Sequence, residues 1–240
     1  MSGRSWIWKG VFELTMVFLG VMGAFLVDGW RERSEEHAQE ILYLERLATD
    51  LRQDSTTIEA GLMPQVERKL DAIAAIAPYA RRRTDVVGDT LAFLRNVALA
   101  GAGGFTAWTF DTPTFDDLMS TGNLRLIQNA DLRTRIVEHY RGVEVQQARM
   151  TARLPGYPNA VHAILPAEER DAITMMSVRD FGADRALARI RSEAFVDLLN
   201  REYNSAVFQR SVGPRLDAST LDLLNAVEGE LSRLGGSTPP

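Results

Sequence analysis

The chain has 240 residues, a net charge of -5 and no cysteine. The acidic balance gives no basis for general nucleic-acid binding, and the missing cysteines exclude a disulfide framework and a thiolate site. If an anchor of about 33 residues is set aside, roughly 205 remain, which is enough for one good-sized core or two small ones.

The N-terminal segment predicts a single transmembrane helix. An apolar run from Leu14 to Val27 contains no charged residue, but crossing a bilayer takes about 20 mostly apolar residues. The segment reaches that length when it is counted from Trp6 to Trp30. Tryptophan prefers the membrane interface, so we expect Trp6, Trp8 and Trp30 to anchor the two ends.

A cleaved signal peptide is the main alternative to this span. It requires a small-x-small site after the apolar run, and residues 27–29, Val-Asp-Gly, match it poorly. The helical pattern continues beyond Trp30, so we expect the segment to be retained.

One stripe of the predicted span can also bind another helix. At about 100° per residue, Glu13, Val17, Gly20 and Ala24 share a face, and Gly20 with Ala24 forms a small-xxx-small pair that permits close helix approach. In the alternative interpretation, Glu13 only reaches the interface beside Lys9. A carboxylate at membrane depth is costly, which keeps both interpretations open.

Basic residues near the span give a weak indication of orientation. Arg4 and Lys9 precede it, and Arg31 and Arg33 follow it. Since lysine and arginine near the ends determine orientation, we expect a cytoplasmic N-terminus and a periplasmic domain in a bacterial inner membrane.

Apolar residues at three- and four-residue spacing predict helices through most of the remaining chain. A long helix is expected from Trp30 to about Gly61, beginning with a polar, solvated stalk at residues 31–40. Further helices are expected from Pro64 to Pro78 and over 85–100. The inward positions are Ile41, Leu44, Ala48, Leu51, Ile58, Leu62, Val66, Leu70, Ile73, Ala77, Val87, Leu91, Leu94 and Ala98.

The middle of the chain carries clear helix-boundary signals. Thr112 or Asp111 is placed to cap a short helix, and Gly122 to end it as a left-handed residue. Asn129 or Asp131 begins the next long helix. Its inward positions are Leu132, Ile136, Tyr140, Val143 and Met150.

The C-terminal region is helical over 183–234 and less regular over 155–182. We expect Gly213-Pro214 to kink or divide the helical part. Its inward positions are Phe195, Leu199, Tyr203, Ala206, Leu216, Leu223, Val227 and Leu231.

The fold class predicted for the whole chain is all-α, because no segment shows sustained two-residue alternation. One N-terminal transmembrane helix continues into a stalk and an extramembrane helical bundle. The expected organisation is a flank and anchor at 1–33, a helical domain at 34–234 with a possible sub-boundary near 155–182, and a disordered tail at 235–240.

The turn at Ser120, Thr121, Gly122 and Asn123 has two interpretations. Its residue types are typical of a helix end followed by a turn, and they can also bind a small polar ligand. We expect His139 and Tyr140 to pack beside this turn, half-buried.

The residues that commonly carry catalysis are scattered. His37, His139 and His162 form no pair at helical spacing, so a zinc site lacks its usual ligands. Adjacent carboxylates do not face each other on a helix. We therefore expect no catalytic residue, no metal site and no cofactor.

Two segments resemble an uncharacterised bacterial family of single-span membrane proteins. They cover roughly the first 60 residues and residues 110–142. Members usually carry a strongly basic N-terminus, whereas this chain has only Arg4 and Lys9 there. The resemblance implies topology and no activity. The matching residues are Gly10, Glu13, Gly20, Ala24, Trp30 to Arg33, Tyr43, Leu44, Leu47 to Asp54, Leu118 to Ile127, Asp131 to Arg133, His139 and Tyr140.

The expected function is that of a non-enzymatic, membrane-anchored scaffold or interaction protein. Its partners would be the lipid bilayer and either another membrane protein or a second copy of the chain. It could serve as an accessory or stabilising subunit of a respiratory or photosynthetic complex. The alternative is a membrane-tethered, ligand-sensing bundle that acts through a partner membrane protein.

Overall fold

The computed structural model describes residues 3–101, 110, 112–151, 156–165 and 183–235. Within helices it describes only the backbone of residues 3–15, 17, 19–21, 23–27 and 150–151. The elements in chain order are α1 (Gly3–Thr56), the π-helix η1 (Thr57–Leu62), α2 (Met63–Ala80), α3 (Thr90–Gly101), α4 (Pro113–Thr121), the 3-10 helix η2 (Asn123–Leu126), α5 (Ala130–Thr151), α6 (Gly156–Ile164), α8 (Ala183–Ile190) and α9 (Glu193–Leu234).

The fold is all-α, as the sequence predicts, and no strand occurs in the described ranges. The apolar periodicity identifies most of the buried faces correctly, including Leu44 to Leu51 on α1 and Leu216 to Leu231 on α9. Tyr203 is an exception, because it is 43% exposed although it falls on a predicted inward stripe.

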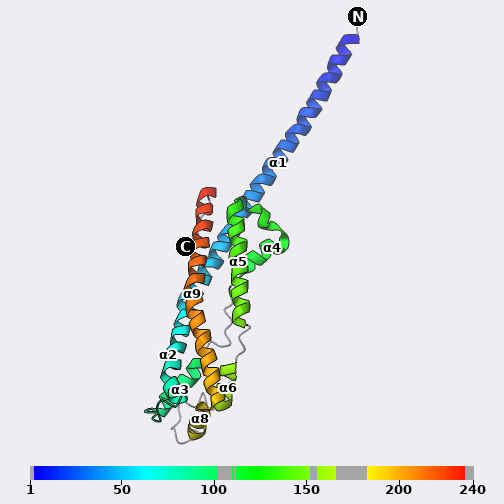
Figure 1. Ribbon diagram of the computed structural model, residues 1–240. Coiled ribbons are helices and arrows are strands. Elements are labelled where there is room, and N and C mark those ends of the chain that lie inside the picture. The colour runs from blue at the N-terminus through cyan, green and yellow to red at the C-terminus, as the bar shows by residue number, and fades with distance from the viewer. Residues whose placement is uncertain (1–2, 102–109, 111, 152–155, 166–182, 236–240) are drawn as a thin grey trace.

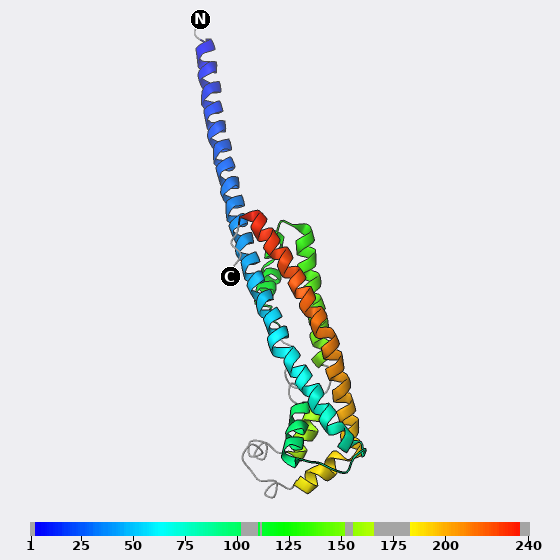
Figure 2. The same ribbon diagram turned by 90° about the vertical axis from the view of Figure 1, so that its left-hand side faces the viewer.

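Pro64 lies in the first turn of α2, as predicted, but no loop separates α2 from the preceding helix, because the π-helical η1 joins them. Proline has no backbone N–H and is tolerated in the first turn of a helix, which is where Pro64 lies in α2. The Met63 N–H donates to Ile58 O, five residues back. As a result, α1, η1 and α2 run in line along the molecule (Figure 2).

Likewise, Gly213-Pro214 does not divide the last helix, because α9 continues through Pro214. Arg215 Nε donates to Ser211 O at 2.9 Å, and its Nη2 lies 3.3 Å from Ser211 Oγ. This side chain therefore supplies a donor to a carbonyl in the turn that the proline disturbs.

The long helices form an elongated bundle (Figure 1). Helix α9 returns beside α1 and α2, and its C-terminal end lies beside α1 where α1 leaves the bundle (Figure 2). Helices α3, α6 and α8 gather at the opposite end. At a rise of 1.5 Å per residue, the bundle section from Glu40 to Ala80 is about 60 Å long.

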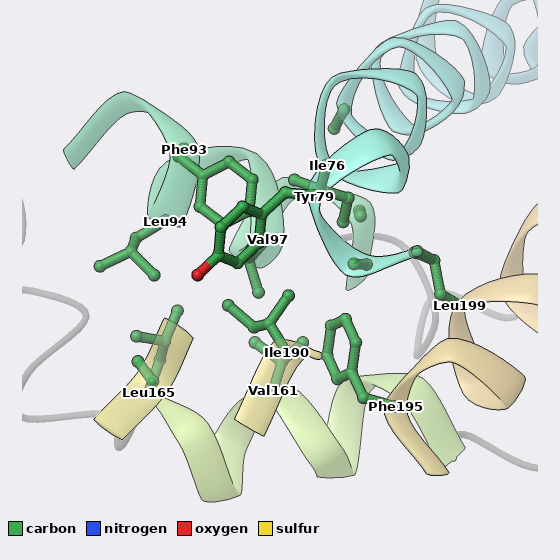
Figure 3. Packing of buried hydrophobic residues seen from close by; sticks show 14 of the residues in the cluster. Ile76, Tyr79, Phe93, Leu94, Val97, Val161, Leu165, Ile190, Phe195 and Leu199 are labelled. Atoms are coloured by element: carbon green, nitrogen blue, oxygen red, sulfur yellow. The ribbon is translucent and has the colours of Figure 1, made fainter. Parts of the chain in front are cut away.

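Two main apolar clusters fill this bundle. The proximal core, nearest the N-terminal part of α1, joins α1, α4, α5 and the end of α9. Its buried residues are Leu44, Leu47, Ala48, Leu51, Phe115, Leu118, Ile127, Leu132, Ile136, Tyr140, Leu223, Leu224, Val227 and Leu231. The distal core joins α2, α3, α6, α8 and the start of α9 (Figure 3). It includes Ile76, Tyr79, Phe93, Leu94, Val97, Val161, Leu165, Ile190, Phe195 and Leu199.

The first part of α1, residues 3–39, extends beyond the bundle in both views and is called the N-terminal arm (Figures 1 and 2). Residues 31–39 are exposed, as the predicted stalk requires, except for half-buried Glu36. Glu40 was included in the predicted stalk, but it is only 1% exposed. Glu40 is buried because it contacts the segment before α5.

Within the described part of the chain, no helix combines the length and the apolar content that a membrane crossing requires. The predicted positions Trp6, Trp8, Glu13, Val17, Gly20 and Ala24 are among those whose side chains lie outside the described ones. The tail at 236–240, and residues 166–182 of the predicted sub-boundary region, also lie outside the described residues.

Candidate functional site

The turn after α4 is shaped by local hydrogen bonds. Gly122 has a φ of 72°, a left-handed conformation that favours glycine. Thr121 Oγ1 donates to Asp117 O at 2.6 Å, and the Asn123 N–H lies 3.4 Å from Thr121 Oγ1. Gly122 therefore ends the helix as the sequence predicts. Ser120 lies on the exposed side of this turn, where its Oγ approaches Asp117 O at 3.3 Å.

The same turn is attached to α1 through Tyr43. Tyr43 OH donates to Asp117 Oδ2 at 2.9 Å and accepts from Asn123 Nδ2 at 2.8 Å. The side chains of Asp117 on α4 and Asn123 in the turn thus hold α4 and η2 against α1. This arrangement supports a structural role for Asn123.

The segment after the turn is fixed by two buried carboxylates that the sequence did not identify. Glu40 Oε1 accepts the Gln128 N–H at 2.7 Å, and Glu230 Oε2 accepts from Asn129 Nδ2 at 3.0 Å. The Arg233 guanidinium lowers the pKa of the Glu230 carboxyl, and the Asn129 amide also lowers it, whereas burial opposes both effects. The two carboxylates connect the start of α5 to α1 and α9.

Asn129 also caps α5, as predicted, because its Oδ1 accepts the Leu132 N–H at 3.1 Å. Arg133 then donates from Nη1 to Ile127 O and lies 3.3 Å from Gln128 O. The motif from α4 to the start of α5 is therefore a compact joint at which α1, α4, α5 and α9 meet.

His139 and Tyr140 follow on α5 and are more deeply buried than predicted, at 8% and 1% exposure. The Tyr140 ring stacks on Phe115 with centroids 4.4 Å apart. Burial raises the pKa of the Tyr140 hydroxyl, and the nearby carboxylates Asp54, Asp50 and Asp116 raise it further. Tyr140 is thus a neutral core residue.

The environment of His139 determines what chemistry it can perform. Its Nδ1 lies 3.3 Å from Ser219 Oγ on α9, and burial lowers its pKa from 6.5 to about 4. A serine nucleophile needs a histidine base that is itself oriented by a third group. His139 Nε2 is buried and has no hydrogen-bond partner in the described residues, so this pair lacks the orienting group and contains a weak base.

A cavity of about 220 Å³ opens between α5 and α9 next to this pair. Gly142 forms part of its wall, and a Cβ placed there would have no atom within 4 Å. The lining residues are Glu138, His139, Gly142, Gln146, Val212, Arg215, Leu216 and Ser219. Among the described residues, no group of three histidine, aspartate or glutamate side chains is placed to hold a metal ion.

The structure brings some predicted residues together and leaves others apart. Asn123 meets Tyr43 and Asp117 at the turn, whereas His139 faces Ser219 across the α5–α9 seam. The cavity was not predicted, because its two walls are more than sixty residues apart in the sequence.

Comparison with known protein families, curated proteins and solved structures finds no match for the chain.

Proposed function

We propose that the chain is a non-enzymatic, membrane-anchored protein that holds an elongated helical bundle beside a bacterial membrane and binds other proteins. It acts there as an accessory or stabilising subunit of a larger membrane complex. The fold, the joint around the turn and the N-terminal arm support this proposal.

The observation that carries the proposal is the unsupported arm of α1. It extends beyond the bundle (Figure 1), and its described apolar side chains are exposed: Met16 is 58% exposed, Phe18 62% and Trp30 70%. Exposed large apolar side chains that cluster on one element are typical of a membrane or protein contact. Lipid or a second helix would cover them.

The stalk supports the same arrangement. Residues 31–35 are charged or polar and exposed, and Arg31 forms an i,i+4 ion pair with Glu35 at 2.8 Å. From Trp30 to Glu40, ten residues of helix span about 15 Å. A tryptophan at the interface would therefore place the start of the bundle about 15 Å from the membrane surface.

Two outcomes are possible for the location of the bundle. The proposed orientation, with a cytoplasmic N-terminus and a periplasmic bundle in the inner membrane, rests on Arg4 and Lys9 before the span. Because the chain has no cysteine, a single cysteine at exposed Gly229 can be labelled in intact cells. Labelling by an impermeant reagent is expected, and labelling only after lysis would reverse the orientation.

The main test is purification of the full chain from membranes in mild detergent, with identification of co-purifying proteins. We expect a stable complex with another membrane protein or with a second copy. The variant carrying Gly20→Leu and Ala24→Leu should lose this partner if the stripe at 13, 17, 20 and 24 is the contact face. A chain recovered outside the membrane fraction, as a monomer without partners, would contradict the proposal.

The second candidate function is ligand sensing through a partner membrane protein. The cavity between α5 and α9 is the observation that favours it. A metabolite that raises the thermal stability of the full chain by mass action would support this alternative.

A further inference from the structure

The cavity between α5 and α9 lies where the packing of the two helices is interrupted. Near the proximal core, α5 and α9 are joined by the Arg135–Asp222 ion pair at 2.8 Å and by the His139–Ser219 contact at 3.3 Å. One turn further along α5 is Gly142, which lacks a side chain. The facing part of α9 lies close to Pro214 in the sequence. The missing side chain at Gly142 leaves this part of the gap open.

Two polar side chains on the α5 wall have unsatisfied buried atoms. His139 Nε2 and Gln146 Oε1 are both buried and have no hydrogen-bond partner in the described part of the chain. An unsatisfied buried polar atom is costly, so such atoms in a natural site require an explanation. A ligand that hydrogen-bonds at this wall, with a small adjustment of the side chains, supplies one.

Opposite charges stand on the two sides of the cavity. The Glu138 carboxylate is on α5, and the Arg215 guanidinium is on α9. The hydrogen bonds described for Arg215 go only to Ser211 of its own helix, which leaves some of its five N–H donors free. The site therefore offers an anion to a cationic group and a cation to an anionic one.

Apart from Ser219, the remaining wall is apolar, and the volume is small. Val212 and Leu216 face the cavity from α9. The volume of about 220 Å³ is below the range of about 300 Å³ and above that is typical of drug-sized pockets. A suitable ligand is small, carries both charges and has a short apolar side.

We infer that this cavity binds a free amino acid or a zwitterion of similar size. Its ammonium group would face Glu138, its carboxylate would face Arg215, and its side chain would lie on Val212 and Leu216. His139, neutral because it is buried, would hydrogen-bond the ligand together with Gln146. This inference does not depend on the membrane anchor.

Titration of the full chain in detergent with L-leucine, L-valine and L-glutamine tests the inference. The chain has three histidines, so the imidazole NMR signals of His139 can be resolved and assigned. We expect at least one of these amino acids to shift the His139 signals saturably at millimolar concentration. Failure of all three to shift them would overturn the assignment.

Analogues that lack one charge test its electrostatic basis. Isoamylamine has the leucine side chain and the amine, and isocaproate has the side chain and the carboxylate. Both are expected to bind at least about tenfold more weakly than leucine, because each lacks one charge-assisted contact. Equal binding of the three compounds would show nonspecific apolar occupancy and contradict the inference.

Four variants complete the test. Glu138→Gln and Arg215→Gln change exposed side chains, so they leave the core intact, and each should weaken amino-acid binding by about tenfold. Gly142→Leu should abolish binding by filling the cavity. Gly229→Leu is its control, because Gly229 also has an exposed helical position with open space around it. Binding that survives Gly142→Leu would place the ligand elsewhere.

Discussion

The buried ion pair between Lys69 of α2 and Glu202 of α9 provides a demanding test of the packing. The side chains are only 4% and 12% exposed. Next to them lies a small apolar cluster that includes Val66, Leu70 and Ala206. Removing one partner of such a pair leaves an uncompensated charge away from water, which typically costs 3–5 kcal/mol.

Lys69→Met should therefore lower the free energy of unfolding by about 3 kcal/mol, and Glu202→Leu by a similar amount. The double variant Lys69→Met with Glu202→Leu should be within about 1 kcal/mol of the wild type, because it removes both charges and buries apolar groups in their place. The strong non-additivity is the signature of a desolvated pair.

The assay is thermal denaturation of the full chain in detergent, followed by far-UV circular dichroism. For a domain of this size, 3 kcal/mol corresponds to a decrease in Tm of about 6–12 °C. The matched control is Arg52–Glu228, which joins α1 to α9 at 2.6 Å with side chains 28% and 30% exposed. Because solvent screens it, Arg52→Met should cost less than about 1 kcal/mol. Equal and small effects at both pairs would refute the proposed burial of Lys69.

Four further predictions concern individual residues, three of them in the proximal half of the bundle and one in the distal core. Gly122→Ala should destabilise the fold by about 1 kcal/mol, because alanine resists a φ of 72°; an unchanged Tm would exclude the left-handed turn. Burial lowers the pKa of His139 from 6.5 to about 4, so the unfolded chain binds more protons across that interval and the fold should lose up to about 3 kcal/mol as pH falls through it. His139→Gln should flatten this pH dependence, and equal pH profiles would contradict the shift. Tyr157→Phe should cost about 1 kcal/mol, because the Tyr157 hydroxyl donates to a buried carbonyl at 3.1 Å. Tyr140→Phe should be neutral or stabilising, because its hydroxyl is buried with no hydrogen-bond partner in the described residues, and a large loss of stability there would reveal a partner.

Local chemistry made part of the fold predictable from sequence. Gly122 and Asn129 were identified because a left-handed residue and a capping side chain each act within a few residues of their own position. The inward faces around Leu47 and Val227 were identified because apolar spacing reflects one helix at a time.

The incorrect predictions concern helix breakers. Pro64 does open α2, but the expected break before it is replaced by the π-helical η1, and Gly213-Pro214 does not divide α9. Packing along a bundle of this length favours continuous helices, and it outweighs the local preference of proline.

The functional candidates could not be located from sequence, because their partners lie far apart in the chain. The Glu40 carboxylate accepts the backbone N–H of Gln128, and the Lys69 ammonium pairs with the Glu202 carboxylate. The same limitation applies to the cavity, because Gly142 on α5 gives no sign that Arg215 will face it. Interpreted alone, each of these residues resembles an ordinary surface position.

The proposed membrane anchor requires α1 to enter the bilayer and to leave it near Trp30. Because the chain has no cysteine, single spin labels can be placed at Ala24 and at Ser34 of the full chain in lipid vesicles. We expect the Ala24 label to collide with oxygen and to be protected from a water-soluble nickel complex, and the Ser34 label to show the reverse. Equal access of the nickel complex to both labels would contradict the proposed anchor.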